Sequence, residues 1–175
     1  NTPKAIPPWG GSKALYGTNP IAFSVPRSKT PPLVIDLSLS KVARGKVMMA
    51  NQKNERIPQG WAIDEQGNPT SDAKKALAGA MLPIGDAKGS ALALMIEILS
   101  AALTGSNFGF EASSFFDSEG DSPGVGQLII AIDPSFFSGD VFSERVETIV
   151  SAILDQPSTR LPGNKRLEKR KWHEK

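Results

Sequence analysis

The spacing of apolar residues predicts two amphipathic helices. Between residues 92 and 103 apolar side chains recur at i, i+3, i+4, i+7 and i+11, which places them on one face of an α-helix that Gly105 ends. This face consists of Leu92, Met95, Ile96, Leu99 and Leu103. A second helix is predicted within residues 140–156, where the in-phase residues are Val146, Ile149, Val150, Ile153 and Leu154. We expect the first of these apolar faces to be buried in the core.

Four shorter apolar stretches predict strands. Residues 21–25 alternate weakly, and the compact run Leu33–Leu37 is the best candidate for a buried strand in the first half of the chain. Residues 61–64 form a short extended piece, and residues 126–134, "GQLIIAIDP", form a fully buried strand. The strands and helices follow no regular βαβ rhythm, so we expect a mixed α/β layer structure and not a doubly wound parallel sheet.

Turn formers and capping residues fill the intervals. A helix is predicted from about Val42, with Ser40 as its cap, and a shorter helix after residue 71, capped by Thr70 or Ser71. Residues 65–69, "EQGNP", predict a turn. Residues 108–126 have no periodicity and form a long loop, and loops of this length are often functional.

Composition narrows the classes of protein. The length of 175 residues fits one domain or one and a half, and no apolar run approaches the roughly 18 residues of a membrane span, so no membrane partner is expected. The absence of cysteine excludes disulfides, thiolate zinc sites and a cysteine nucleophile, and makes a reducing cytoplasm the default compartment. Residues 160–175 carry seven basic side chains and two glutamates. Such a tail can bind nucleic acid, but it is more often a solvated helix end, so no nucleic-acid partner is expected.

Common catalytic signatures are missing. The one histidine, His173, lies in the charged tail, so no Ser–His–Asp set can form within this chain. There is no HExxH motif, and no metal site is expected. The dinucleotide fingerprint GxGxxG is absent, and "GDAKGS" lacks the order of a phosphate-binding P-loop.

Two local features indicate chemistry. Asp36 lies within the apolar run "LVIDLSL", where a buried carboxylate must be hydrogen-bonded or have a shifted pKa. It is either a strand-end residue that caps a turn or pairs with a lysine, or an acid/base or relay group. The loop that leads into the helix of residues 92–103 contains Gly85, Gly89 and Lys88, which favour an anion at the helix N-terminus, although Asp86 opposes it. On pattern alone, an anion site and a plain helix start remain open.

Six segments in order carry a family resemblance: "PPWGGSKALYGTNPIAFSVP", "VIDLSLSKVARGKV", "IPQGWAIDEQGNPTSDAKKAL", "LPIGDAKGSALALMIEILSAALTG", "GQLIIAIDP" and "RLPGNKR". Over residues 3–170 the chain resembles the malate/L-lactate dehydrogenase family of type-2 NAD(P)-dependent oxidoreductases. The resemblance implies a non-Rossmann fold of the sulfolactate dehydrogenase type, with a mixed, largely antiparallel sheet and packed helices. It also implies NAD or NADP as cofactor, a small-molecule substrate and a homodimer. The implied reaction is hydride transfer to or from the α-carbon of a small 2-oxo or 2-hydroxy acid or a cyclic imino acid.

The resemblance also implies site residues. Asp36 matches a family aspartate that acts in a relay with a histidine, so it is the expected catalytic residue, and Thr18 is expected near the substrate. The expected cofactor contacts are Leu33, Val34, Ile35, Asp36, Leu37, Ser38, Ala87, Lys88, Gly163, Asn164 and Lys165.

Two departures qualify the resemblance. The family's acid/base histidine lies in a Ser-His-Gly segment near the N-terminus of the full protein, and these 175 residues lack it. We therefore expect a cofactor-binding domain over residues 1–140 and a C-terminal helix and basic tail over residues 141–175, with the N-terminal part missing and the chain inactive by itself. In addition, Asp86 and Ala87 replace a common glycine and a common aromatic residue or histidine, which would disfavour a 2′-phosphate.

Three alternatives for function remain open. The loop of residues 108–128 is more similar to the Δ1-piperideine-2-carboxylate/Δ1-pyrroline-2-carboxylate reductase branch than to the malate branch. A malate-, lactate- or ureidoglycolate-type dehydrogenase is the alternative within the family. From another class, the chain could be a non-catalytic nucleotide-binding or oligomerisation remnant.

Overall fold

The computed structural model describes residues 1–173 and divides into two compact units. The larger unit contains Asn1–Pro20 and Ser38–Leu128, and the smaller unit contains Ile21–Leu37 and the chain from Ile129 onward. Both are built from helices and small antiparallel sheets, which confirms the predicted mixed α/β class. The predicted division of roles at residue 140 stays a prediction. The last two residues of the predicted charged tail lie outside the described range.

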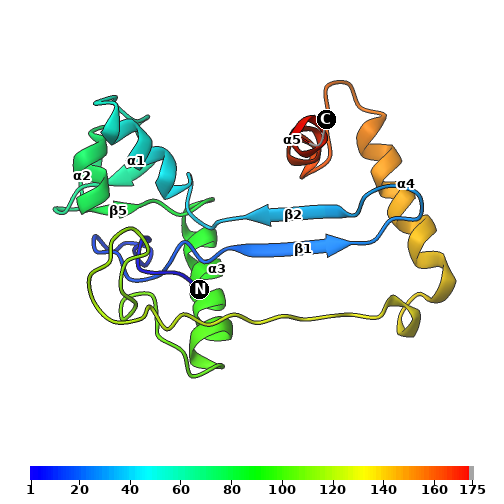
Figure 1. Cartoon of the computed structure of the whole chain (residues 1–175), viewed down its shortest axis with the longest axis horizontal. Helices are drawn as coiled ribbons and strands as arrows, with labels where there is room; N and C mark the ends of the chain where they lie inside the picture. The colour runs from blue at the N-terminus through cyan, green and yellow to red at the C-terminus, as the bar shows by residue number, and fades with distance from the viewer. Residues whose placement is uncertain (174–175) are drawn as a thin grey trace. The chain divides into compact units, whose positions relative to one another are not determined.

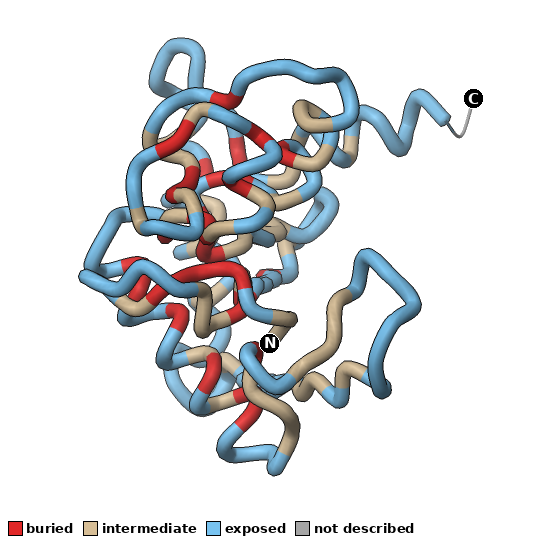
Figure 2. Tube along the Cα trace, turned by 90° about the vertical axis from the view of Figure 1, so that its left-hand side faces the viewer, coloured by how far each residue is buried: buried red, intermediate tan, exposed pale blue. Residues whose placement is uncertain are grey.

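The larger unit packs three helices and a π-helical turn with a three-stranded sheet of order β4-β3-β5 (Figure 1). Most of the buried positions of the chain lie in this unit, as the red stretches of Figure 2 indicate, and Ile6, Leu39, Val47 and Met81 are its largest fully buried apolar side chains. Its elements are α1 (Arg44–Gln52), β3 (Ala62–Ile63), β4 (Pro69–Thr70), α2 (Ala73–Ala78), β5 (Ala80–Met81), α3 (Ala87–Glu97) and η1 (Ile98–Ala102).

The predicted turn between β3 and β4 is confirmed. The Asp64 carboxylate accepts hydrogen bonds from the backbone N–H groups of Gln66 at 3.0 Å and Asn68 at 2.9 Å. This side chain closes the turn by satisfying two amides that the short strands leave free.

The helix caps differ from those predicted. Asp72 caps α2, because its carboxylate accepts from the N–H groups of Lys74 and Lys75, while Thr70 belongs to β4. Ser40 does not cap α1 either. Its hydroxyl donates to the carbonyl of Val42 at 2.8 Å, and α1 begins one residue after Ala43.

Helix α3 forms where predicted, but its buried face is not the predicted one. The buried positions are Gly89, Ser90, Ala93 and Glu97. Of the predicted apolar face, Leu92, Met95 and Leu103 are exposed, and Ile96 and Leu99 are half-buried. The prediction of a core-facing apolar row is therefore wrong. Small and hydrogen-bonded residues form the inner side because the helix packs closely on the backbone of the preceding loop.

Glu97 fixes the inner side of α3. It is 3 % exposed, and its carboxylate accepts hydrogen bonds from the Asn19 side chain at 2.6 Å and from the backbone N–H of Gly109. Asn19 also donates to the carbonyl of Ala93 at 2.8 Å. A buried carboxylate is tolerated where hydrogen-bond donors surround it, so this cluster ties α3 to two loops.

The smaller unit contains a two-stranded antiparallel ribbon. Strands β1 (Ile21–Val25) and β2 (Leu33–Leu37) have the predicted bounds and pair in register from Ile21 opposite Leu37 to Val25 opposite Leu33. The expectation of a buried β2 is wrong, because its residues are half-buried or exposed and no described strand pairs with its other edge. The other elements are η2 (Pro134–Phe136), η3 (Gly139–Val141), α4 (Phe142–Leu154) and α5 (Asn164–His173).

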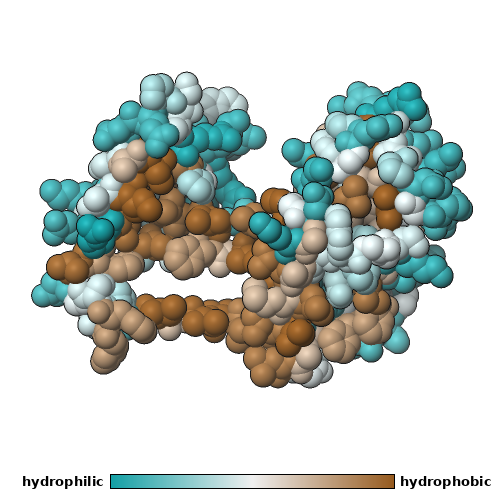
Figure 3. Space-filling view, turned by 180° about the vertical axis from the view of Figure 1, so that it is seen from behind, coloured by the Kyte–Doolittle hydropathy of each residue, from teal (hydrophilic) through white to brown (hydrophobic). Residues whose placement is uncertain are grey.

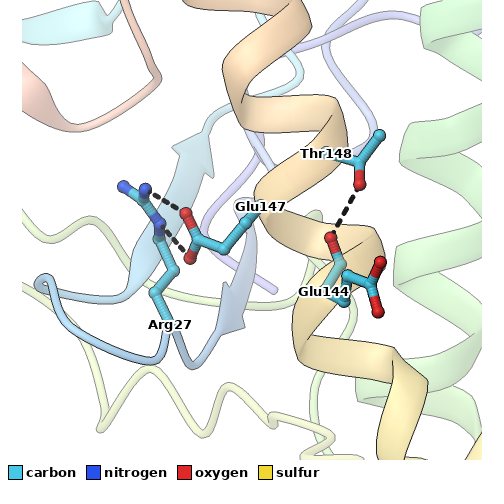
Figure 4. A network of polar contacts seen from close by, with 4 residues as sticks. All are labelled: Arg27, Glu144, Glu147 and Thr148. Atoms are coloured by element: carbon cyan, nitrogen blue, oxygen red, sulfur yellow. Dashed lines mark hydrogen bonds and ion pairs between the residues drawn. The ribbon is translucent and has the colours of Figure 1, made fainter.

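An ion pair joins the β1–β2 turn to α4. Nε and Nη2 of Arg27 donate to the two carboxylate oxygens of Glu147 at 3.0 and 2.6 Å (Figure 4). One turn away, the Thr148 hydroxyl donates to the backbone carbonyl of Glu144 at 2.8 Å. The predicted helix α4 is thus confirmed. Helix α5 replaces the charged tail that the sequence analysis placed after the turn at residue 163.

Residues 126–134 contradict the sequence-based expectation. They form no strand, and Ile129, Ile130 and Ile132 are 84, 71 and 67 % exposed. A strand needs a neighbouring backbone to satisfy its N–H and C=O groups, and none of the described chain supplies it here. Among residues 1–173, no helix is both long enough and apolar enough to cross a membrane.

Candidate functional site

A cavity of about 330 Å³ in the larger unit contains the best-formed candidate site. It lies beside the N-terminus of α1 and beneath the loop of residues 112–116. Its polar and aromatic lining consists of Thr2, Thr18, Ser38 and Ser114, the cations Lys4 and Arg44, and Phe115 and Phe116. Backbone of Ala43 and Gly45 completes one wall.

Arg44 is the most distinctive group of this cavity. Its guanidinium donates to the carbonyl of Leu77 at 3.1 Å and lies 5.9 Å from the ring centre of Phe116. Burial lowers the pKa of Arg44, because the charged form loses water, and no carboxylate among the described residues forms a salt bridge with it. Arginine has five N–H donors, so most of its donors remain available to a ligand.

The charge of the cavity is one-sided. Lys4 and Arg44 both line it, and no aspartate or glutamate among the described residues does. The first backbone N–H groups of α1 add partial positive charge, since no side chain caps this helix. The cavity therefore suits a ligand with more than one negative group.

Hydroxyl groups gather on the opposite side of the cavity. Thr18 donates its backbone N–H to the hydroxyl of Thr2 at 2.8 Å, and the two hydroxyl oxygens are 3.2 Å apart. The hydroxyl of Ser38 lies 3.2 Å from that of Ser40. Thus the structure brings Thr18, the predicted substrate contact, into one cavity with Ser38, a predicted cofactor contact.

A second group of predicted residues meets in the smaller unit. Gly163 has φ of +82°, and a Cβ there would lie 3.0 Å from the carbonyl oxygen of Val34, so glycine suits both the backbone and the packing. Leu33 and Asn164 line a separate cavity of about 210 Å³. Two predicted cofactor segments, 130 residues apart, therefore lie together.

Asp36 lies on the same strand and is not buried. Its Oδ2 accepts a hydrogen bond from Nη1 of Arg166 at 2.6 Å, with the two side chains 41 and 65 % exposed. The expectation of a carboxylate buried in an apolar strand is wrong, because β2 lies in a two-stranded ribbon. The alternative that paired this residue with a basic side chain is closer, although the partner is an arginine.

Ala87 and Lys88 form the first residues of α3, and both are exposed. The N–H of Lys88 donates to the carbonyl of Gly85 at 3.2 Å. Gly89 does not leave room for a ligand as expected, because a Cβ there would strike the carbonyl of Ile84. It is a packing glycine.

Asp86 has an unusual backbone conformation immediately before α3. Its φ is +56° and its ψ is −123°, a combination that glycine adopts far more readily than other residues, and its side chain does not cap the helix. The departure noted from the family pattern at this position thus coincides with backbone strain.

Sequence reasoning missed Arg44 and Lys4. One signal was present: Arg44 begins a helix, where the macrodipole disfavours a cation, so a basic residue there needs another reason. His173 lies exposed at the end of α5, against the ring of Trp172. No cluster of three metal-ligating side chains occurs within residues 1–173.

Comparison with known proteins gives a consistent family. The model of the malate/L-lactate dehydrogenase family matches residues 1–175. The chain is 60 % identical to a (2R)-3-sulfolactate dehydrogenase (NADP(+)) of Chromohalobacter salexigens, over 95 % of this chain and 50 % of the relative. It is 45 % identical to a Δ1-pyrroline-2-carboxylate/Δ1-piperideine-2-carboxylate reductase of Pseudomonas aeruginosa, over 94 % of this chain and 50 % of the relative.

Solved structures agree with these matches. The crystal structure of Δ1-piperideine-2-carboxylate reductase from Pseudomonas syringae superposes with a TM-score of 0.89 at 40 % identity, over 97 % of this chain and 52 % of that one. Sulfolactate dehydrogenase from Methanocaldococcus jannaschii superposes with a TM-score of 0.81 at 37 % identity, over 93 % of this chain and 48 % of that one. The chain spans about half the length of the curated relatives it matches.

Proposed function

Because the chain belongs to the malate/L-lactate dehydrogenase family, as its motifs predicted, we propose that it carries the substrate cavity of an NAD(P)-dependent oxidoreductase. The reaction is hydride transfer to or from the α-carbon of a small 2-hydroxy or 2-oxo acid. The substrate carries a second acidic group in addition to its carboxylate.

One observation carries this choice of substrate. Lys4 and Arg44 line a cavity to which the described residues contribute no carboxylate. A desolvated guanidinium binds a planar or tetrahedral anion through paired N–H donors, and a second cation nearby favours a second anionic group. A relative at 60 % identity is a 3-sulfolactate dehydrogenase, and 3-sulfolactate has both a carboxylate and a sulfonate.

The arrangement of polar groups suggests the role of each. Arg44 holds one anionic group of the substrate, and Lys4 holds the other. The hydroxyl of Thr18, which lies across the cavity, orients the substrate oxygen on the α-carbon. Such fixed positioning is how a protein assists a hydride transfer, because the reacting carbon must approach in one geometry.

The residues present fit a nicotinamide dinucleotide in two places. Gly163 leaves no Cβ between its backbone and the Val34 carbonyl, and Asn164 and Leu33 line the cavity beside it. Lys88 and the uncapped N-terminus of α3 offer positive charge to a phosphate. When bound, the cofactor supplies or accepts the hydride. The proposed contacts also include Ile35, Leu37, Ala87 and Lys165, all from the predicted segments.

Asp36 is proposed as a positioning residue for proton transfer. Its carboxylate is accessible and already accepts one hydrogen bond from Arg166. In the parent enzyme it would hold a histidine, contributed from outside these residues, that exchanges a proton with the substrate. On this proposal the chain alone is inactive, and the parent adds the missing catalytic group and completes a sheet of non-Rossmann type.

A cyclic imino acid is the second candidate substrate. Phe115 and Phe116 give one side of the cavity an apolar wall, which fits a five- or six-membered ring better than a sulfonate. Relatives at 45 and 40 % identity are reductases of such imines. The same guanidinium of Arg44 would then hold the single carboxylate.

We also propose that the parent enzyme is a homodimer. The support is the outer side of α3 and η1, where the exposed large apolar residues are Leu92, Leu94, Met95, Ile98 and Leu103. Monomeric proteins rarely leave such a row in water. Light scattering of the parent should therefore give twice the monomer mass.

Activity can be tested in a joined protein, in which this chain replaces the matched half of the Chromohalobacter salexigens relative. Its reductase activity is measured with NADPH and with NADH on 3-sulfopyruvate, oxaloacetate, pyruvate and Δ1-piperideine-2-carboxylate. The proposal predicts turnover of the two dianionic acids, with a KM at least about tenfold below that for pyruvate, which is about 1.4 kcal/mol of binding. Preference for pyruvate would reject the dianion, and turnover of the imine alone would favour the second candidate.

A further inference from the structure

Residues 129–133 of the smaller unit have the sequence of a buried strand but are solvent-exposed. Ile129, Ile130 and Ile132 are each more than 60 % exposed, and Figure 1 draws this yellow stretch as a nearly straight trace. Successive side chains of an extended chain point to opposite sides. Because isoleucines occur at both odd and even positions, both faces of this segment are apolar. Figure 3 shows the brown surface that results.

The backbone of this segment is also unsatisfied by the described chain. Within residues 1–173, its N–H and C=O groups make no hydrogen bond to another backbone group. Apolar side chains on both faces are typical of a strand at the centre of a sheet, where layers cover each side. Solvated loops, in contrast, rarely carry three isoleucines in four positions.

The ribbon of the same unit is incomplete in a similar way. Directly opposite residues share a face, so one face of β1–β2 carries Ile21, Phe23, Val25, Leu33, Ile35 and Leu37. Phe23 is 54 % exposed on this face, and β1 has no described strand on its other edge. A two-stranded ribbon is at best marginally stable in water, so this unit lacks strands.

The geometry points to one occupant: a β-strand from the half of the full-length polypeptide that these 175 residues do not span pairs with the backbone of Ile129–Asp133. The curated relatives are about twice as long as the part matched by this chain, so a second half of similar size exists in such proteins. The added strand is apolar on at least one face, and it satisfies the ladder of residues 129–133 while its own neighbours cover the isoleucines. This inference goes beyond the proposed reaction and does not depend on the substrate.

A second copy of this chain fits less well. When two identical edges pair, each copy covers one edge of the other and retains its second edge. Such a pair also leaves the apolar faces of both segments in water. A strand that arrives with the rest of its domain removes both deficits.

The test compares this chain alone with the joined protein described above. Backbone hydrogen exchange is followed by mass spectrometry on a peptide that covers residues 127–134. In the chain alone we expect exchange near the rate of an unstructured peptide, and in the joined protein we expect it to be slower by at least about 100-fold, as for paired strands. Light scattering of the chain alone reports whether copies associate.

A proline variant gives an independent readout. Ile130→Pro removes one N–H donor and blocks strand pairing, but residue 130 makes no backbone hydrogen bond within the described chain. It should lower the midpoint of thermal unfolding of the joined protein by at least about 4 °C and leave that of the chain alone unchanged. Ile130→Val, which keeps a strand-forming side chain, should change neither, and Phe136→Ala, an exposed aromatic outside the segment, is the matched control.

Three results would overturn the inference. Rapid exchange of residues 127–134 in a folded joined protein would show that no strand pairs there. Protection in the chain alone, together with a doubled mass, would identify a second copy as the occupant. An equal effect of Ile130→Pro on both proteins would show that the segment acts within this chain.

Discussion

Nη1 of Arg166 on α5 lies 2.6 Å from Oδ2 of Asp36 on β2. This ion pair joins the two segments that the family motifs assigned to the cofactor, and both side chains remain partly exposed. Exposed ion pairs contribute about 0–1 kcal/mol to stability, so the pair is not required to hold the unit together. Its carboxylate is free to serve another role.

Asp36→Asn tests that role in the joined protein. We expect little change in the unfolding midpoint, but a fall in turnover of about 100-fold, because the amide cannot support a protonated histidine. Arg166→Gln is the control, since it breaks the ion pair and keeps the carboxylate. Near-normal turnover of Asp36→Asn would eliminate the positioning role, and an equal loss in both variants would assign the effect to the pair.

Asp86→Gly should stabilise the chain. The residue adopts φ of +56° and ψ of −123° without a capping contact, and such a conformation costs about 1–3 kcal/mol for a residue with a Cβ. Glycine loses part of this gain through the entropy of the unfolded chain, which leaves about 1 kcal/mol measurable by denaturant unfolding. Asp86→Ala removes the carboxylate but keeps the Cβ, so it should bring no gain. Equal stabilisation by alanine would attribute the effect to charge.

Glu97→Ala should strongly destabilise the larger unit. It strands the Asn19 amide and the Gly109 N–H in a buried site, with an expected loss of about 3 kcal/mol. Met95→Gln on the exposed side of the same helix should stay within about 0.5 kcal/mol of the parent chain. Chemical denaturation of both variants measures the contrast. A larger effect of Met95→Gln would mean that the apolar row is the inner face of α3 after all.

Acid should weaken the ion pair that holds α4. The hydrogen bonds from Arg27 lower the pKa of Glu147, so the folded state favours the ionised carboxylate. The resulting stabilisation is complete above the ordinary glutamate pKa of about 4.3 and is lost as the pH falls through the lower folded value. The difference in unfolding midpoint between the parent and Glu147→Gln should therefore be large near neutral pH and vanish in strong acid. Glu144→Gln, on the same helix, should show little difference at either pH. A pH-independent effect of Glu147→Gln would contradict this assignment.

Local patterns in the sequence predicted local structure well. β1, β2 and α4 formed where alternation or helical spacing indicated, and Asp64 closed the predicted turn, because each depends on neighbours in the chain. The caps were misassigned by one or two residues, since Asp72 and the serine or threonine beside it are all competent acceptors. Only the backbone geometry decides between them.

Packing could not be predicted in the same way. Helical spacing placed Leu92 and Met95 on one face, but it could not show that Gly89, Ala93 and Glu97 form the inner one. Likewise, the run Ile129–Ile132 was correctly identified as strand-like, yet it is unpaired within the described chain. Both errors concern surfaces that need a partner.

The candidate site was predicted in part. Family motifs selected Thr18 and Ser38, which share a cavity, and Asp36 and Gly163, which lie together in the smaller unit. Arg44 was missed because no local pattern distinguishes a helix-start arginine that lines a cavity from one in solvent. Its significance depends on Leu77, Phe116 and Lys4, which are distant in sequence.

The most direct test of the account measures ligand binding to this chain by calorimetry, with 3-sulfolactate and lactate as matched dianion and monoanion. We predict that 3-sulfolactate binds at least about tenfold more tightly than lactate, and that Arg44→Met abolishes the difference, while Lys88→Met leaves it unchanged. Equal binding of the two acids, or a preference that survives Arg44→Met, would contradict the claim that the Arg44 cavity is the substrate site.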